Sequence, residues 1–219
     1  RTVLIDTGFN KQAADERGRE LIRCPAESLS LVGADANEIE DTIITHLHYD
    51  HVGNFDLFPK TRFHLQDKEM QFATGRYMRH KTLRHSFDIE HVTGMVREVY
   101  KERVIFHDGD TDLFPGIKLH FIGGHTMGMQ SVTVETARGR VVVASDASHL
   151  YHNMWDQNPF RTVFNIGDMM EGHEKLRVLA GADQDLIVPG HDPQVLDFYP
   201  APSPDLEGIV VRLDVPPKK

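Results

Sequence analysis

This sequence of 219 residues predicts a mixed α/β fold. Strand-like segments rich in β-branched and aromatic residues dominate its middle, and helix-compatible segments lie before and after them. Because strands and helices do not alternate regularly, a sandwich of sheets and helices is favoured over a repeated βαβ unit. Hydrophobic residues make up 40% of the chain, enough for a sizeable core. We therefore expect a single domain over 1–219.

The first half of the chain predicts short strands between helical segments. Expected strands lie at 2–6, 41–45 and 61–65. Expected helical segments lie at 10–23, 25–32 and 66–102. Pro25 suits the first position of a helix, and Gly33 suits the position just after its end.

Strands are denser in the second half. They are expected at 117–122, 130–136, 140–145 and 185–189. The turn "ARGR" between the second and third of these predicts a β-hairpin. One helix is expected over 166–180, and the last strand leads directly into Gly190 and His191.

Composition excludes several classes of protein. The formal net charge is −9, which argues against a nucleic-acid or anionic-membrane partner. No apolar run approaches the roughly 20 residues that a membrane span requires. The single cysteine, Cys24, excludes an internal disulfide framework. No signal peptide is visible, so we expect a cytoplasmic location, although the chain begins with Arg1 in a strand-like segment.

The stretch "THLHYDHVGN" contains a dense group of polar side chains, with His46, His48, Asp50 and His51 inside six consecutive positions. Chance alone would produce the pattern H-x-H-x-D-H roughly 0.005 times in a chain of this composition. His46 and His48 can point to the same side because residues two apart share a face in extended chain. The cluster can thus offer two ligand pairs to adjacent ions. Imidazole and carboxylate groups suit zinc and other first-row metals.

Three more candidate ligands follow hydrophobic strands. His125 lies in "FIGGHTMG", Asp146 in "VVVASDASH" and His191 in "LIVPGHD". Taken singly, each is typical of a capping residue or a turn former. Their joint occurrence after the cluster, at strand ends of the same kind, favours ligands that complete a two-metal site.

This order of motifs resembles the metallo-β-lactamase superfamily. H-x-H-x-D-H followed by G-H-T, S-D-A and G-H-D carries the resemblance, and Asp6 in "LIDTG" resembles the aspartate of that superfamily's first motif. The resemblance covers the chain from Asp6 to His191. It implies an αββα sandwich of two mixed sheets flanked by helices, with a metal site at one edge of the sheets.

Within the superfamily, "GGHTMGMQSVTV" and "ASDASHLY" are most similar to the N-acyl-homoserine lactone lactonases. The resemblance implies two divalent ions, with zinc preferred and iron, manganese and cobalt as alternatives. It also implies the following roles: His46, His48 and His125 hold one ion, Asp50, His51 and His191 hold the other, Asp146 bridges the two, and Asp6 orients the cluster from the second shell.

The sequence departs from the lactonases in two places. Lactonases usually carry strands before "LIDTG", and these are absent from this sequence. The better-known lactonases also place a tyrosine three positions after the bridging aspartate, where this chain has His149, while Tyr151 lies two residues further on. His149 is therefore the predicted hydrogen-bond donor to the carbonyl and proton carrier to the leaving oxygen, with Tyr151 as the alternative. Together with Asp50, it forms the predicted catalytic pair.

The resemblance implies the opening of a lactone ring, in a substrate of the N-acyl-homoserine lactone kind, through a metal-bridging hydroxide. The sequence leaves open another ester, thioester or amide hydrolase on the same core. A remote third alternative is a non-hydrolytic metal or redox protein. No G-x-S-x-G motif indicates a serine nucleophile.

A helical insert over 66–102 is the expected wall of the substrate pocket, against the alternative of a surface hairpin. The predicted substrate contacts are Tyr77, Met78, Phe87 and Tyr151. Other histidines have no motif context and are expected at the surface or behind the ligands; they are His64, His91, His107, His120, His152 and His173. The expected partner is a small lactone or ester, with no nucleic acid and no membrane; a homodimer stays open.

Overall fold

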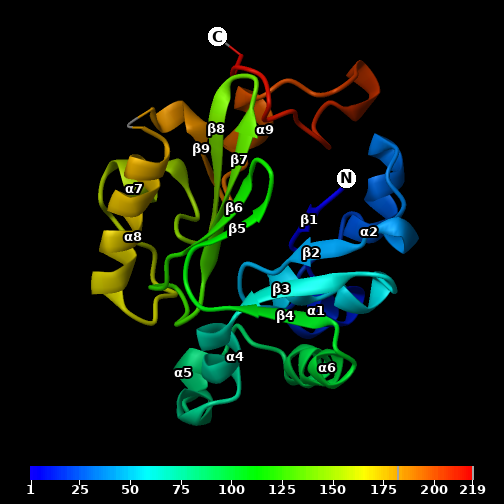
Figure 1. Cartoon of the computed structure of the whole chain (residues 1–219), viewed down its shortest axis with the longest axis vertical. Helices are drawn as coiled ribbons and strands as arrows, with labels where there is room; N and C mark the ends of the chain where they lie inside the picture. Colours follow the sequence, from blue (N-terminus) through cyan, green and yellow to red (C-terminus); the bar gives the residue numbers. More distant parts are fainter. Residues whose placement is uncertain (182, 219) are drawn as a thin grey trace. The chain divides into compact units, whose positions relative to one another are not determined.

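Two β-sheets organise the chain, and each is formed by its own half of the sequence (Figure 1). The computed structural model describes residues 1–181 and 183–218. Its backbone divides into two compact units, Arg1–Asp108 and Gly109–Lys219. The single domain expected over 1–219 stays a prediction, and the two units are described separately below.

The sheet of the first unit has four parallel strands in chain order. They are β1 (Leu4–Ile5), β2 (Asp41–Ile43), β3 (Arg62–Gln66) and β4 (Val104–His107). Ile5 pairs with Ile43, and Ile43 with His64. Because parallel strands end at one edge of a sheet, Asp6 after β1 and the His cluster after β2 emerge at the same edge.

Helices of the first unit are short, apart from α6. They are α1 (Lys11–Glu16), α2 (Pro25–Ser28), α3 (Tyr49–Val52), α4 (Asp67–Ala73), α5 (Lys81–Arg84) and α6 (Ile89–Tyr100), with 3₁₀ turns η1 (Leu29–Val32), η2 (Ala36–Glu38), η3 (Phe55–Leu57) and η4 (Arg76–Arg79). Asp88 caps α6 by accepting a hydrogen bond from the Glu90 amide at 2.8 Å. The helix buries Val92 and Met95, side chains three apart on one face.

The second unit contains a mixed five-stranded sheet. Its strands are β5 (Thr111–Phe114), β6 (Ile117–Phe121), β7 (Gln130–Thr136), β8 (Gly139–Ser145) and β9 (Ile187–Pro189). Strands β5 to β8 pair antiparallel, and β9 pairs parallel to β8. Strands β6, β8 and β9 therefore run in the same direction, and the segments after them leave at one edge.

Helices of the second unit pack on this sheet. They are α7 (Tyr151–Trp155), α8 (Ile166–Leu179) and α9 (Gln194–Phe198), with 3₁₀ turns η5 (Gln184–Leu186) and η6 (Pro204–Leu206). Helix α8 runs beside the sheet in Figure 1 and places Leu176 in a core with Val142 and Ala144. Full burial of one such leucine contributes about 1.5–3 kcal/mol. This core holds the ends of β8 and β9, from which candidate ligands extend.

Most predicted elements are confirmed, with bounds that are equal to the predicted ones or differ by a few residues. The hairpin at "ARGR" is present, with Thr136 paired to Gly139. The helix-compatible segment 10–23 is helical only in α1. Strands β4 and β5 and helices α7 and α9 were not predicted. Each has only four or five residues, and turn formers surround β5, so contacts distant in the sequence decide these elements.

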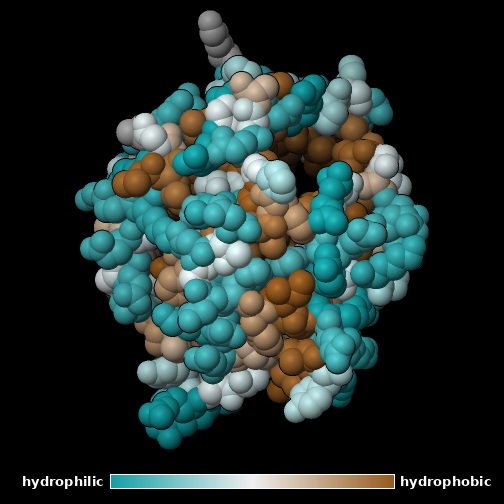
Figure 2. All heavy atoms as spheres, viewed as in Figure 1, coloured by the Kyte–Doolittle hydropathy of each residue, from teal (hydrophilic) through white to brown (hydrophobic). Residues whose placement is uncertain are grey.

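Hydrophilic residues cover much of the face shown in Figure 2, with hydrophobic residues interspersed. This surface agrees with a charged fraction of 26%. Within the described part of the chain, every helix is too short or too polar to cross a membrane.

Candidate metal centre

Three histidine rings lie against one another in the loop after β2. The His46 ring centroid is 4.6 Å from that of His48 and 4.0 Å from that of His51. All three residues are buried, with at most 5% of their surface exposed, and Asp50 is half-buried in α3. The three predicted histidine ligands of the first unit thus lie together in one loop.

Asp6 fixes the orientation of this loop. Its carboxylate accepts hydrogen bonds from the Thr45 amide and the Thr45 hydroxyl, both at 2.7 Å. The same carboxylate lies 2.8 Å from Nδ1 of His51. Asp6 adopts a left-handed backbone conformation with φ 58°, which is costly for a residue with a Cβ and is typical of functional sites. These contacts support the predicted second-shell role of Asp6.

Hydrogen bonds also determine which ring nitrogen His46 and His51 can offer to a metal. The Thr45 hydroxyl has one proton, which it donates to Asp6, so it accepts from Nδ1 of His46 at 3.1 Å. Nδ1 of His51 likewise donates to Asp6. In the neutral rings Nε2 then carries the lone pair. This is the tautomer that a metal-binding histidine requires.

A buried acid supports the loop from a second element. Glu69 on α4 is fully buried and accepts a hydrogen bond from the Leu47 amide at 2.9 Å. Glu69 has no signal in the sequence, because an acidic residue in the first turn of a short helix is common. This hydrogen bond ties Glu69 to Leu47, the residue between His46 and His48 in the chain.

Candidate ligands of the second unit meet at the carboxylate of Asp146. Asp146 follows β8 directly, His191 follows β9, and His125 lies in the loop after β6. Nε2 of His125 is 3.3 Å from Oδ2 of Asp146, and Nε2 of His191 is 3.1 Å from Oδ1. The common direction of β6, β8 and β9 produces this convergence.

Two glycines permit close approaches near these ligands. A Cβ on Gly190 would lie 2.7 Å from Oδ1 of Asp146. Gly124, with φ +81°, would place a Cβ 2.6 Å from the Met169 backbone nitrogen. A larger residue at either position would displace the backbone beside His191 or His125.

His149 joins the same group of side chains. Its Nε2 lies 2.8 Å from Oδ2 of Asp146, and its ring stacks on Phe160 with centroids 3.4 Å apart. Ligand atoms of His125, Asp146 and His149 all lie within 4.8 Å of one another, close enough to hold one ion. Tyr151, the alternative to His149, is instead buried in the core and stacks on Trp155 at 4.9 Å.

The donor set of each unit fits a first-row divalent metal. Nδ1 of His125 donates to the Thr162 carbonyl oxygen at 2.6 Å, so Nε2 of the neutral ring faces Asp146 as a second acceptor. Two facing acceptors repel unless a cation lies between them or the ring is protonated. With imidazole and carboxylate donors in both units, the residues match the ligand chemistry of zinc, iron, manganese and cobalt.

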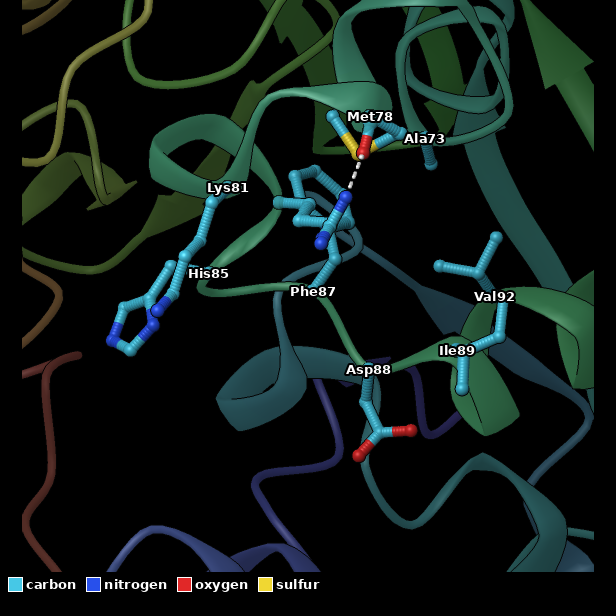
Figure 3. A pocket seen from close by; sticks show the side chains of 9 residues that line it. Ala73, Met78, Lys81, His85, Phe87, Asp88, Ile89 and Val92 are labelled. Atoms are coloured by element: carbon cyan, nitrogen blue, oxygen red, sulfur yellow. Dashed lines mark hydrogen bonds between the residues drawn. The ribbon is translucent and has the colours of Figure 1, made fainter.

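A cavity of about 430 Å³ opens within the first unit, along the predicted 66–102 segment (Figure 3). Apolar side chains form much of its wall, and charged ones border it; the lining residues are Ala73, Met78, Lys81, Arg84, His85, Phe87, Asp88, Ile89 and Val92. In Figure 3, Lys81 and His85 lie on one side, and Ile89 and Val92 on the other. Of the predicted substrate contacts, Met78 and Phe87 line this cavity, whereas Tyr77 packs on Phe72 at 5.9 Å.

Phe87 connects the cavity to the His loop. Its backbone forms a β-bridge with His48, and the two rings meet edge to face at 4.6 Å. The Tyr49 amide donates to the Ser86 carbonyl oxygen at 2.9 Å. A molecule in this cavity would therefore touch a residue that contacts a candidate ligand.

Most histidines outside the motifs do not lie at the surface, which was one of the two positions expected for them. His152 is exposed, but His64, His91, His107, His120 and His173 are buried. His64 lies between Asp41 and His107, at 3.1 Å from each. Burial lowers the pKa of all five, chiefly by desolvating the charged form. Sequence alone could not reveal this, because each follows or lies within an ordinary strand or helix.

An α/β fold with two sheets and clustered His and Asp side chains is typical of metal-dependent hydrolases. The chain belongs to the metallo-beta-lactamase superfamily, whose profile matches residues 1–191. The predicted fold class, enzyme class and superfamily are thereby confirmed.

Known relatives share this fold and much of the length. The N-acyl homoserine lactonase AiiA of Bacillus thuringiensis subsp. kurstaki is 27% identical over 207 residues, covering 87% of this chain and 76% of the relative. The N-acyl homoserine lactonase AttM of Azorhizobium caulinodans is 27% identical, covering 84% and 68%. A solved quorum-quenching N-acyl homoserine lactone lactonase superimposes with a TM-score of 0.72 at 25% identity, covering 87% and 74%.

Proposed function

We propose that this protein opens the ring of lactones, with N-acyl-homoserine lactones as the preferred class. The observation that carries the proposal is the similarity, over 87% of the chain, to relatives named as N-acyl homoserine lactonases. Identity of 27% leaves the substrate open, so hydrolysis of other esters, thioesters or amides on the same core is the alternative.

The proposed cofactor is a pair of divalent ions, with zinc as the first choice. The proposed ligands are the seven that the sequence predicted, namely His46, His48, Asp50, His51, His125, Asp146 and His191. When bound, such ions lower the pKa of water and polarise a carbonyl oxygen. Four of the ligands stand in the first unit and three in the second, and the resemblance to the superfamily supports their joint use.

The remaining tasks fall to side chains of this chain. Asp6 and Thr45 keep His46 and His51 in the tautomer that presents Nε2. Asp50, half-buried beside His51, is the proposed acceptor of the proton lost by the attacking water. Phe160 holds the His149 ring at a fixed angle beside Asp146. Preorganisation of this kind reduces the rearrangement that the reaction requires.

The cavity of the first unit is the proposed site for the acyl chain. Met78, Phe87, Ile89 and Val92 provide an apolar wall, and the Phe87–His48 contact places that wall next to a candidate ligand. An acyl chain of several carbons would gain about 0.8 kcal/mol for each buried methylene. The cations Lys81 and Arg84 at its border suit the polar amide or the carboxylate of the product.

Proton release from lactones of increasing acyl length tests the proposal, with thioesters and simple esters in parallel. We expect kcat/KM to rise with acyl length for lactones and to exceed that for thioesters. Met78→Trp, which fills the cavity, should remove the preference for long chains and leave the unsubstituted lactone unaffected. Efficient thioester hydrolysis with inert lactones would overturn the proposal in favour of the alternative.

A further inference from the structure

His149 occupies an unusual place among the candidate ligands of the second unit. Its Nε2 lies closer to the Asp146 carboxylate than that of either predicted histidine ligand, 2.8 Å against 3.3 Å for His125 and 3.1 Å for His191. The three rings approach from three segments, after β6, after β8 and after β9. Neither the superfamily ligand set nor the similarity to lactonases assigns a metal-binding role to this position.

The spacing is that of ligands sharing one ion. Nitrogen and oxygen ligands stand about 2.0–2.2 Å from zinc, so two neighbouring ligands of one ion are about 2.8–3.6 Å apart, from octahedral to tetrahedral geometry. Nε2 of His149 and Nε2 of His125 lie 2.8 Å and 3.3 Å from Oδ2 of Asp146, and the ligand atoms of the three residues all lie within 4.8 Å of one another. The nitrogen that faces Asp146 is Nε2, the same one that His125 presents.

The His149 ring is also held in place, as expected for a preorganised ligand. It stacks on Phe160 with an interplanar angle of 10°. Its backbone carbonyl oxygen accepts a hydrogen bond from the His191 amide at 2.9 Å, which joins the two histidine-bearing loops. Side chain and main chain of His149 are therefore both fixed relative to Asp146 and His191.

We propose that His149 is a further metal ligand, through Nε2, in addition to the seven predicted from the sequence. The inference rests on the metal dependence in the proposed function and not on the identity of the substrate. It replaces the proton-carrying role predicted for His149, because a coordinated Nε2 has no lone pair left to accept a proton. An additional imidazole favours binding of first-row transition metals over magnesium or calcium.

The alternative is that His149 only donates a hydrogen bond that orients Asp146. His149→Gln separates the two roles, because the glutamine amide can still donate to Asp146 but is a poor ligand for these metals. His152→Gln is the matched control, since His152 is exposed on α7 and contacts Asp156 at 2.9 Å. Cobalt(II) alone is the probe, added to metal-free full-length protein without substrate.

Competition with a chelator measures cobalt affinity, and visible absorption reports the coordination of the ion. We expect His149→Gln to lose at least about 10-fold in affinity for one ion and to change its visible spectrum, with no change for His152→Gln. His149→Cys should create a thiolate-to-cobalt charge-transfer band that the wild type lacks. Cys24, the single native cysteine, lies far from this loop in the sequence.

Two results would contradict the inference in distinguishable ways. Unchanged affinity and spectrum in His149→Gln, together with no charge-transfer band in His149→Cys, would overturn the ligand role alone. Failure of the wild type to bind cobalt would overturn the metal dependence on which the proposed function also rests. Inactivity towards lactones would leave the cobalt measurements, and hence the ligand role, unaffected.

Discussion

In the first unit, four candidate ligands lie within six consecutive residues, whereas in the second unit they come from separate strand ends, two of them 45 residues apart. The first group is stabilised from outside by Asp6, which reaches Thr45 and His51. The second is organised around one of its own ligands, Asp146, which three histidine rings approach. Ligands that are neighbours in the chain are held by a residue outside the group, here Asp6. Ligands that are distant in the chain are held by contacts to one member of the group, here Asp146.

Loss of Asp146, the carboxylate that three histidines contact, should have the largest effect on metal content and activity. Asp146→Ala removes the carboxylate that His125, His149 and His191 surround, and leaves their rings without a common partner. We expect metal content to fall below two ions per chain and activity to fall on the order of 10³-fold, more than the roughly 10- to 100-fold typical of second-shell changes. Elemental analysis and lactone hydrolysis measure both. Full metal content with normal activity would show that the second unit does not depend on Asp146.

Loss of Asp6, which supports the His loop from outside, should have a smaller effect on metal binding and activity. Asp6→Ala removes the acceptor for Thr45 and His51, so the His loop loses its fixed tautomers while every ligand remains. We expect metal affinity or kcat/KM to fall by about 10- to 100-fold. Asp15→Ala is a control, because Asp15 is exposed and pairs with exposed Lys11 on α1. A loss in Asp6→Ala equal to that in Asp146→Ala would remove the distinction between the two regions.

The smallest expected effect is a pH dependence of folding stability. It arises from buried histidines in both units that are not candidate ligands. Burial lowers the pKa of His64, His107 and His173, so the folded chain binds protons less readily than the unfolded chain. Stability should therefore be constant above the ordinary histidine pKa of about 6.5 and decrease as the pH falls below it. At its steepest, the decrease is about 1.4 kcal/mol per pH unit for each such histidine.

Urea unfolding of metal-free protein between pH 7.5 and pH 5 measures this decrease without a contribution from metal loss. A free energy of unfolding that stays constant over this range would contradict it. A decrease confined to the metal-bound protein would instead assign the pH dependence to the candidate ligands.

The difference between the two regions also explains which site residues can be predicted from the sequence. His46, His48, Asp50 and His51 are neighbours in the chain, so their spacing alone indicates a metal site. Strand ends at His125, Asp146 and His191 are visible because each follows a hydrophobic run. Helix α8 is likewise recognisable from its helix-forming residues, and the hairpin after β7 from its turn residues.

Other features exist only after folding, because they depend on contacts between residues distant in the chain. The left-handed backbone at Asp6 and Ser145 has no signal in residue type. The choice of Nε2 in His46 and His51 depends on Asp6, some 40 residues away. The position of His149 against Phe160 and Asp146 follows from the packing of α7 and the loop before α8. Local propensity describes single segments, whereas hydrogen-bond partners and burial are set by the register and direction of strands that pair across the chain.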